Sequence, residues 1–223
     1  CETVTAPDVA DGILAEVHRH GDVRLVLMGW PGHVAPEEIP HTPLARVLHE
    51  ARADVACFLD RGLTSVRRVL VAFGGGVHAR LGVRLALELV DPEEGEVVVL
   101  RCFVPAGRHE GARVDEEEAV SPMEDEFLLL REELEATLGE MPANLRFKVV
   151  AEQELLKGIL AELAAEPYDL VVLGAAVARS LKTEFFGSIT DAVAQQIPAS
   201  VLLVRRYEPA AMGWWLIAAH QQH

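Results

Sequence analysis

The sequence predicts an α/β protein whose complete domain is a doubly wound parallel sheet of five strands, preceded by the second half of a similar domain. Three observations lead to this prediction. The composition is that of a globular protein, with 50% hydrophobic and 25% charged residues among 223. Short apolar runs alternate with amphipathic stretches of helical period, which is the order of an α/β fold. The same helix–strand pattern also occurs twice along the chain.

The internal repeat sets the organisation of the chain. Gly-Ile-Leu-Ala-Glu at 12–16 recurs at 158–162, and Leu-Val-Leu-Met-Gly at 25–29 recurs as Leu-Val-Val-Leu-Gly at 170–174. Each copy reads as an amphipathic helix followed by a continuous apolar run that ends in glycine. A continuous apolar run of this length is typical of a parallel strand that is buried on both faces.

Each copy then continues through a loop and a second helix to another apolar run, at 55–59 in the first copy and 200–204 in the second. Between the copies the alternation goes on. Strands are predicted at 67–73, 96–104 and 145–150, and helices at 77–90 and 118–138. Because crossovers between parallel strands are right-handed, this order implies one parallel sheet with helices on both faces.

We therefore divide the chain into an incomplete domain at 1–61, a complete domain at 66–206 and a C-terminal tail at 207–223, with a short linker at 61–65. The first copy lacks the two opening strands of the complete domain. A half domain leaves a sheet edge and apolar faces uncovered, so we expect it to pack against the complete domain or against a further segment.

Charge and cysteine usage exclude several classes of function. Lys and Arg number 20 against 35 Asp and Glu, a formal charge of −15, and no run of basic residues appears, so a nucleic-acid partner is not expected. The three cysteines form no CxxC pair, so neither a disulfide framework nor a metal site is indicated. Without a signal peptide or an apolar run of membrane-spanning length, we expect a cytoplasmic setting.

Ligands of open α/β sheets bind at the carboxyl ends of strands, where the strand order reverses. The first loop of this kind begins at Phe73, which closes a predicted strand, and continues through Gly74, Gly75 and Gly76 into the next helix. Glycines there let backbone N–H groups approach a ligand, and a helix amino terminus favours an anion. His78 faces either the ligand or solvent.

A second loop follows the strand at 170–173. Its candidate binding positions are Gly174, Val177, Gly187, Ser188, Ile189 and Thr190. Their spacing after a Val-rich strand, with a helix start and the apolar run Pro198–Val204 behind them, resembles the nucleotide loop of the universal stress protein family.

The resemblance implies the adenine nucleotide alpha hydrolase-like fold and ATP or AMP as ligand. In that family the loop glycines let the backbone wrap the phosphates, a role that falls here to Gly174, with Gly187, Ser188 and Thr190 holding them. Two positions differ. Val177 stands where the family has a second glycine, and its branched side chain crowds a close backbone approach. Glycine also replaces the acid that follows the first strand and meets the adenine.

The resemblance also implies a two-fold interface through the last strands. Here Val55–Leu59 and Val201–Val204 are such strands within one chain, so we expect an intramolecular pseudo-dimer or a homodimer. The sequence Gly-Gly-Gly-Val-His at 74–78 is similar to stress-protein-like domains of bacterial amino-acid permeases and related transporters. A membrane is expected as a partner only if the chain belongs to such a transporter.

Three functions are weighed. The first is a non-catalytic regulatory or ligand-sensing module with no catalytic residues and no metal. The second is an NADP-binding Rossmann-type oxidoreductase fragment, since Gly74, Gly76 and Ala79 fit the dinucleotide fingerprint and Arg101 could meet a 2′-phosphate. The third is a purely structural dimerisation module of a membrane transporter.

Overall fold

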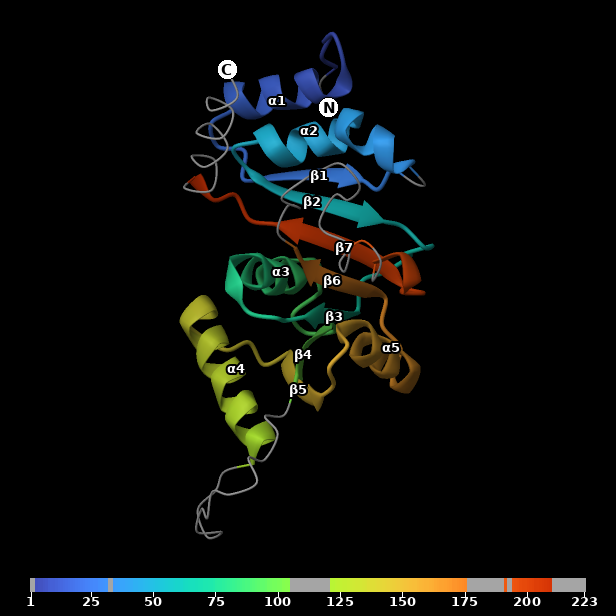
Figure 1. Ribbon diagram of the computed structural model, residues 1–223. Helices are drawn as coiled ribbons and strands as arrows, with labels where there is room; N and C mark the ends of the chain where they lie inside the picture. The colour runs from blue at the N-terminus through green and yellow to red at the C-terminus, as the bar shows by residue number, and fades with distance from the viewer. Residues whose placement is uncertain (1–2, 32–33, 105–120, 176–190, 192–193, 210–223) are drawn as a thin grey trace, which may run out of the picture.

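Seven strands form one sheet in the computed structural model, in the order β1-β2-β7-β6-β3-β4-β5 (Figure 1). The structure describes residues 3–31, 34–104, 121–175, 191 and 194–209. The strands are β1 (Leu25–Gly29), β2 (Asp54–Leu59), β3 (Arg68–Ala72), β4 (Glu96–Phe103), β5 (Leu145–Ala151), β6 (Leu170–Gly174) and β7 (Ser200–Arg205).

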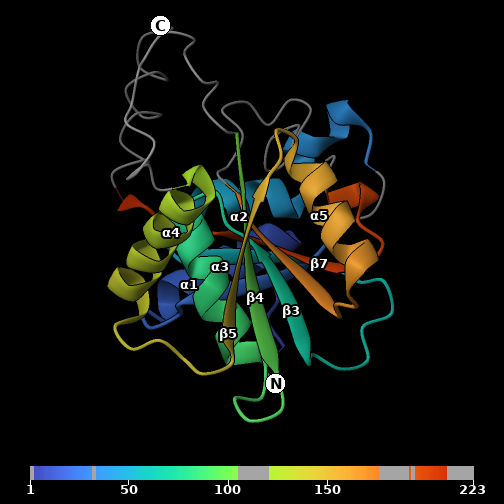
Figure 2. The same cartoon turned by 90° about the horizontal axis from the view of Figure 1, so that it is seen from below.

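Helices cover both faces of the sheet. They are α1 (Val9–Arg19), α2 (Pro43–Glu50), α3 (Gly76–Leu89), α4 (Pro122–Leu138) and α5 (Leu155–Ala165), with a 3-10 turn, η1, at Pro36–His41. Figure 2 shows α3 and α4 on one side of the strands and α5 on the other. Alternate strand residues feed two buried clusters, one with α1, α2 and α5 and one with α3 and α4. The core thus has two layers separated by the sheet.

The predicted five-stranded parallel sheet is confirmed within residues 66–206, where β7, β6, β3, β4 and β5 are parallel neighbours. The first copy adds β1 and β2, which are parallel to each other. Between the copies β2 pairs with β7 in the antiparallel sense, so the arrows of β2 and β7 point in opposite directions in Figure 1. The expected pairing of the two last strands within one chain is therefore confirmed.

The two copies share one register. Leu25 pairs with Asp54 in the first copy as Leu170 pairs with Ser200 in the second. In the antiparallel pair, Cys57 lies opposite Leu203, and these two residues are themselves equivalent in the two copies. A pseudo-two-fold axis therefore passes through the Cys57–Leu203 pair and relates β1–β2 to β7–β6.

The expected uncovered edge is present at β1. Leu25 and Leu27 are 36% and 64% exposed, whereas the equivalent Leu170 and Val172 are 2% and 0% exposed. The difference follows from the neighbours, because β6 has β3 beside it and α3 above it. Within the described residues, no strand pairs with the free edge of β1.

Helix boundaries follow their caps. The prediction that the fourth helix begins at residue 118 was wrong, since α4 begins at Pro122. Ser121 precedes it and forms a capping box with Glu124, and proline at the first helical position fixes a helical φ. Thr42 is the N-cap of α2, and its hydroxyl accepts a hydrogen bond from Ala45 N at 3.2 Å. Among the described helices, none is both long and apolar enough to cross a bilayer.

Candidate functional site

The site lies where the chain reverses its path across the sheet. From β3 the chain proceeds outward to β4 and β5, then returns to add β6 and β7 on the other side of β3. The carboxyl ends of β3 and β6 therefore flank the switch point, which is where open α/β sheets bind ligands. Both glycine loops singled out in the sequence begin there.

The first loop leaves β3 in a conformation that only glycine adopts readily. Phe73 is buried and its N–H donates to the Leu100 carbonyl at 2.8 Å, which keeps the strand extended to that point. Gly75 and Gly76 then have φ of +85° and +79°. Gly75 is also the N-cap of α3, and among the described residues no side-chain hydrogen bond caps that helix. Within this part of the chain, the first-turn N–H groups of α3 have no side-chain acceptor beside the switch point.

Gly174 places the end of β6 directly against the first turns of α3. A Cβ atom at this position would lie 2.4 Å from Ala79 N and 2.6 Å from the carbonyl carbon of His78, both in the first turns of α3. No side chain fits there. The glycine at the end of β6 therefore lets α3 pack directly against the strand, and the structure gives it a packing role in addition to any contact with a ligand.

A carboxylate that sequence reasoning missed lies beside the first loop. Glu133 Oε2, from α4, is 3.6 Å from the position that a Cβ of Gly75 would take. This oxygen is buried and has no hydrogen-bond partner among the residues that the structure describes, while Glu133 Oε1 is 3.3 Å from Arg101 Nη1. No local pattern distinguishes Glu133 from the other acids of α4, because its place depends on how α4 packs on the sheet.

Arg101 ends inside a cluster of acids. Its Nε lies 2.8 Å from Glu126 Oε2, and its Nη1 contacts Glu133. Two carboxylates therefore compete with any 2′-phosphate for this guanidinium. The geometry does not favour the NADP hypothesis, which had assigned the phosphate to Arg101.

His78 faces the segment after β7, neither the glycine loop nor open solvent. Its Nδ1 accepts a hydrogen bond from Arg206 N at 2.9 Å, and its Nε2 is 3.9 Å from Glu208. Burial lowers the pKa of His78 below its usual value, and the nearby Arg205 acts in the same direction, whereas Glu208 opposes the shift. A neutral imidazole ring that carries no proton on Nδ1 can accept this hydrogen bond.

The other predicted positions of the second loop lie outside the described residues. They are Val177, Gly187, Ser188, Ile189 and Thr190. The site that the structure describes is therefore formed by Phe73, the three glycines after it, the first turn of α3, Gly174 and Glu133.

The equivalent position in the first copy differs in its surroundings. Gly29 ends β1, and a Cβ there would have nothing within 4 Å. Trp30 N continues the strand pairing by donating to the Phe58 carbonyl at 2.8 Å. Within the described part of the chain, no counterpart of β3 or α3 lies beside Gly29. Among the described residues, the first copy therefore has the counterpart of β6 but not the counterparts of β3 and α3 that complete the switch point.

Comparisons with known proteins agree with this fold. The universal stress protein family matches residues 65–205. A universal stress protein from Archaeoglobus fulgidus superposes with a TM-score of 0.58 at 19% identity over 89% of this chain, which spans 66% of that protein. A functionally unknown protein from Pseudomonas aeruginosa gives a TM-score of 0.53 at 13% identity, covering 97% of this chain and 74% of that one.

A universal stress protein solved in complex with cAMP is also similar. It shares 15% identity over 63% of this chain and 97% of its own length, with a TM-score of 0.46. No curated protein matches the chain.

Proposed function

Because the chain belongs to the universal stress protein family, we propose that it is a cytoplasmic regulatory or ligand-sensing module that binds an adenine nucleotide, ATP or AMP, without chemistry of its own. One observation carries this proposal. Gly75 and Gly76 take left-handed φ values, and no described side chain caps the amino terminus of α3 at the switch point. An anionic phosphate is the ligand that this arrangement of N–H groups and helix dipole suits best.

The unpaired oxygen of Glu133 supports a nucleoside rather than a bare phosphate. A buried carboxylate oxygen without a donor is unfavourable, and a ligand N–H or O–H would satisfy it. The resembled family uses an acid at the end of its first strand for the adenine side, a position that is Gly74 here. We propose that Glu133 takes over this contact from α4, accepting from the adenine amine or a ribose hydroxyl.

The non-catalytic role rests on how the neighbouring titratable groups are used. His78 Nδ1 accepts from the backbone of Arg206, and Arg101 is held by Glu126 and Glu133. Each of these groups stabilises the fold, so a general base or acid for phosphoryl transfer would have to break an existing contact. We expect bound ATP to persist without hydrolysis.

Calorimetric titration with ATP, AMP, cAMP and NADPH tests the proposal, with the thermal midpoint as a second readout. Saturable binding of ATP or AMP should raise the midpoint, since a ligand that binds only the folded state stabilises it. Phosphate release during incubation with ATP should stay at the level of the protein-free control. Stabilisation by NADPH alone would favour the oxidoreductase hypothesis. If none of the four nucleotides binds, a purely structural module is favoured.

Three variants locate the ligand. Glu133→Ala should weaken nucleotide binding about tenfold, the loss of one hydrogen bond to a charged group, while Glu132→Ala, on the exposed side of α4, should leave it unchanged. Val177→Gly should tighten binding, because it restores the glycine of the resembled loop. Equal affinities of the two Glu variants would remove Glu133 from the site.

We also propose that the first copy is the second half of another stress-protein-like domain. The shared register of β1–β2 and β6–β7 and the antiparallel β2–β7 pair support this proposal. Removing residues 1–61 should expose β7 and let two shortened chains pair through it, giving a dimer by light scattering. A shortened chain that stays monomeric at high micromolar concentration would contradict it.

A further inference from the structure

A buried arginine ends β7. Arg205 is only 7% exposed, and its Nη1 atom is buried without a hydrogen-bond partner among the described residues. Burial lowers the pKa of its guanidinium, although the nearby Asp54 and Glu208 oppose the shift. A buried cation without a partner is unfavourable, and an anion that reaches it would stabilise it.

Both backbone neighbours of Arg205 are hydrogen-bonded to the candidate site. Ala175 N, at the residue that follows β6, donates to the Val204 carbonyl at 2.9 Å. On the other side, Arg206 N donates to His78 Nδ1 in the first turn of α3 at 2.9 Å. Arg205 therefore lies beside the switch point, next to the end of β6 and the start of α3.

The side chain of Arg205 points to the face of the sheet opposite α3. Leu203 belongs to the cluster that packs with α1, α2 and α5, and Val204 to the one that packs with α3 and α4, so strand alternation puts Arg205 on the side of Leu203. Burial lowers the pKa values of His49 in α2 and His78 in α3, and the charge of Arg205 lowers both further. The guanidinium is thus within electrostatic reach of both helices, and an anion at the amino terminus of α3 would feel its charge.

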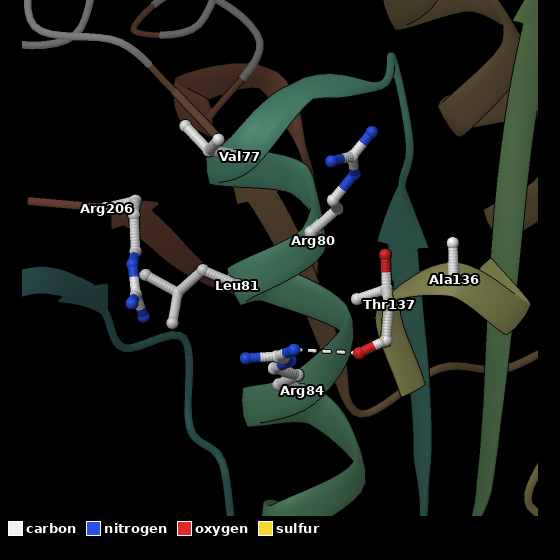
Figure 3. Close-up of a pocket in the computed structure, with 7 residues that line it drawn as sticks. All are labelled: Val77, Arg80, Leu81, Arg84, Ala136, Thr137 and Arg206. Carbon is white, nitrogen blue, oxygen red and sulfur yellow. Dashed lines mark hydrogen bonds between the residues drawn. The ribbon is translucent and has the colours of Figure 1, made fainter. Parts of the chain in front are cut away.

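The other arginines near this end of α3 do not offer the same contact. In the pocket that Figure 3 shows on the face of α3, Arg84 Nη2 donates to the Thr137 carbonyl at 2.7 Å. Arg206 Nη1 lies 2.9 Å from a carboxylate oxygen at the start of β2. Arg80, in the same view, is exposed, so water hydrates its charge. Within the described part of the chain, Arg205 is the one of these four that combines burial with an unpaired nitrogen.

The amino terminus of α3 and Arg205 lie along one edge of the sheet. The helix begins after β3, whereas Arg205 ends β7, and β6 separates these two strands. Neighbouring strands are about 4.8 Å apart, so the distance across them is roughly 10 Å. A single phosphate group cannot span this distance, but a chain of phosphates can.

We propose that Arg205 binds the outer phosphates of a nucleoside triphosphate whose remaining phosphate rests on the amino terminus of α3. This role rests on the nucleotide site proposed above, and it narrows the ligand from ATP or AMP to ATP. The arginine guanidinium presents paired N–H donors that match phosphate oxygens. AMP, with one phosphate, reaches the helix terminus or Arg205 but not both.

Calorimetric titration of the full chain with ATP, AMP and inorganic tripolyphosphate tests this proposal. ATP should bind about tenfold more tightly than AMP, since it gains a charge-assisted contact. Arg205→Met should remove this preference and the binding of tripolyphosphate, while the affinity for AMP stays unchanged. Arg206→Met changes an exposed neighbour that has a carboxylate partner, and as the matched control it should keep the preference.

A second readout separates ligand binding from a structural role. Replacing a buried unpaired charge with an apolar side chain should leave the thermal midpoint of the nucleotide-free chain unchanged or raise it. Arg205→Lys keeps the charge but not the planar donor group, so it should bind ATP more weakly than the unchanged chain and more tightly than Arg205→Met. Circular dichroism checks the fold of both variants. A lower midpoint of the nucleotide-free chain in both would assign Arg205 to the fold and overturn the proposal.

The titrations also distinguish this proposal from the proposed function. Equal affinities for ATP and AMP, or an ATP preference that both Arg205 variants keep, would overturn the role of Arg205 and leave the nucleotide site standing. If tripolyphosphate binds through Arg205 and ATP binds no better than tripolyphosphate, the phosphate contact is confirmed and the nucleoside part of the proposed function is wrong. If neither ATP nor tripolyphosphate binds, both proposals are wrong.

Discussion

The two copies of the helix–strand pattern share sequence and register but differ in burial. In the second copy β6 lies between β3 and β7 with α3 packed on it, and its first four residues, 170–173, are all buried. In the first copy β1 has one neighbour and alternates between exposed and half-buried residues. A similar run of five apolar residues is thus core in one place and surface in the other. The neighbours, not the strand itself, decide the outcome.

The largest effect is expected from the glycines that end the two strands. Gly174→Ala should destabilise the fold by about 3 kcal/mol, because its Cβ would overlap backbone atoms of α3 that cannot move away cheaply. Gly29→Ala meets open space and should change stability by less than about 0.5 kcal/mol. Urea denaturation measures the free energy of unfolding of both variants. Equal losses of this free energy would contradict the expected difference between the two strands.

Alanine at equivalent strand positions should give the next largest difference. Val172→Ala removes a fully buried side chain in contact with α3 and should cost about 2 kcal/mol. Leu27→Ala changes an exposed side chain and should cost less than about 0.5 kcal/mol. A larger cost for Leu27, measured by chemical denaturation of the isolated chain, would mean that the face of β1 is covered in solution.

A third pair concerns the residue just before each strand. Asp169 Oδ2 accepts hydrogen bonds from Arg67 N and Arg68 N at 2.8 and 2.9 Å and so holds the start of β3 against β6. Arg24 occupies the equivalent position before β1. Asp169→Ala should cost about 1 kcal/mol, whereas Arg24→Ala should be nearly neutral in the thermal midpoint. Equal effects, or a larger effect for Arg24→Ala, would show that the contact with β3 does not set the contribution of this position.

The smallest effect is expected from pH, at the junction between the copies. Burial lowers the pKa of His78, so the folded chain keeps the ring neutral while the unfolded chain protonates it near its usual value of 6.5. The stability that His78 contributes is therefore present above pH 6.5 and lost as the pH falls through the folded pKa.

Thermal midpoints between pH 7.5 and 5.0 check this behaviour. His78→Asn should flatten the decline at acidic pH, and His18→Asn, at an exposed position near the end of α1, should not. If the thermal midpoints of both variants fall with pH as steeply as that of the unchanged chain, the acid sensitivity comes from other groups.

Sequence reasoning predicted the elements because their signals are local. Period, strand length and the glycine after each apolar run are properties of neighbouring residues, and they placed β6 and α3 to within a residue or two. The pairing of β2 with β7 was also predicted, although on the resemblance and not on the residues alone. The start of α4 was missed because the acids before Ser121 look like the first turn of a helix, whereas Pro122 and the capping box set its beginning.

The sequence predicted those residues of the candidate site that belong to a local glycine pattern at the end of a strand. The glycines at 74–76 can be recognised from the sequence, because together they follow a strand and lead into a helix. Glu133 does not, because its distance to Gly75 depends on the packing of α4 across 58 positions of chain. A groove between the first copy and α3, lined by several arginines, was missed for the same reason. Arg24, Arg52 and Arg84 lie far apart in sequence, and the fold brings them to one surface.

Hydrogen exchange with and without ATP tests the central claim most directly, because it reports on the two copies in one experiment. The account predicts slowed exchange at the first-turn amides of α3, residues 76–78, and at residues 174–175, with no change at 29–31 at the end of β1. Unchanged exchange at 76–78 under saturating ATP, or equal protection at 29–31, would contradict it.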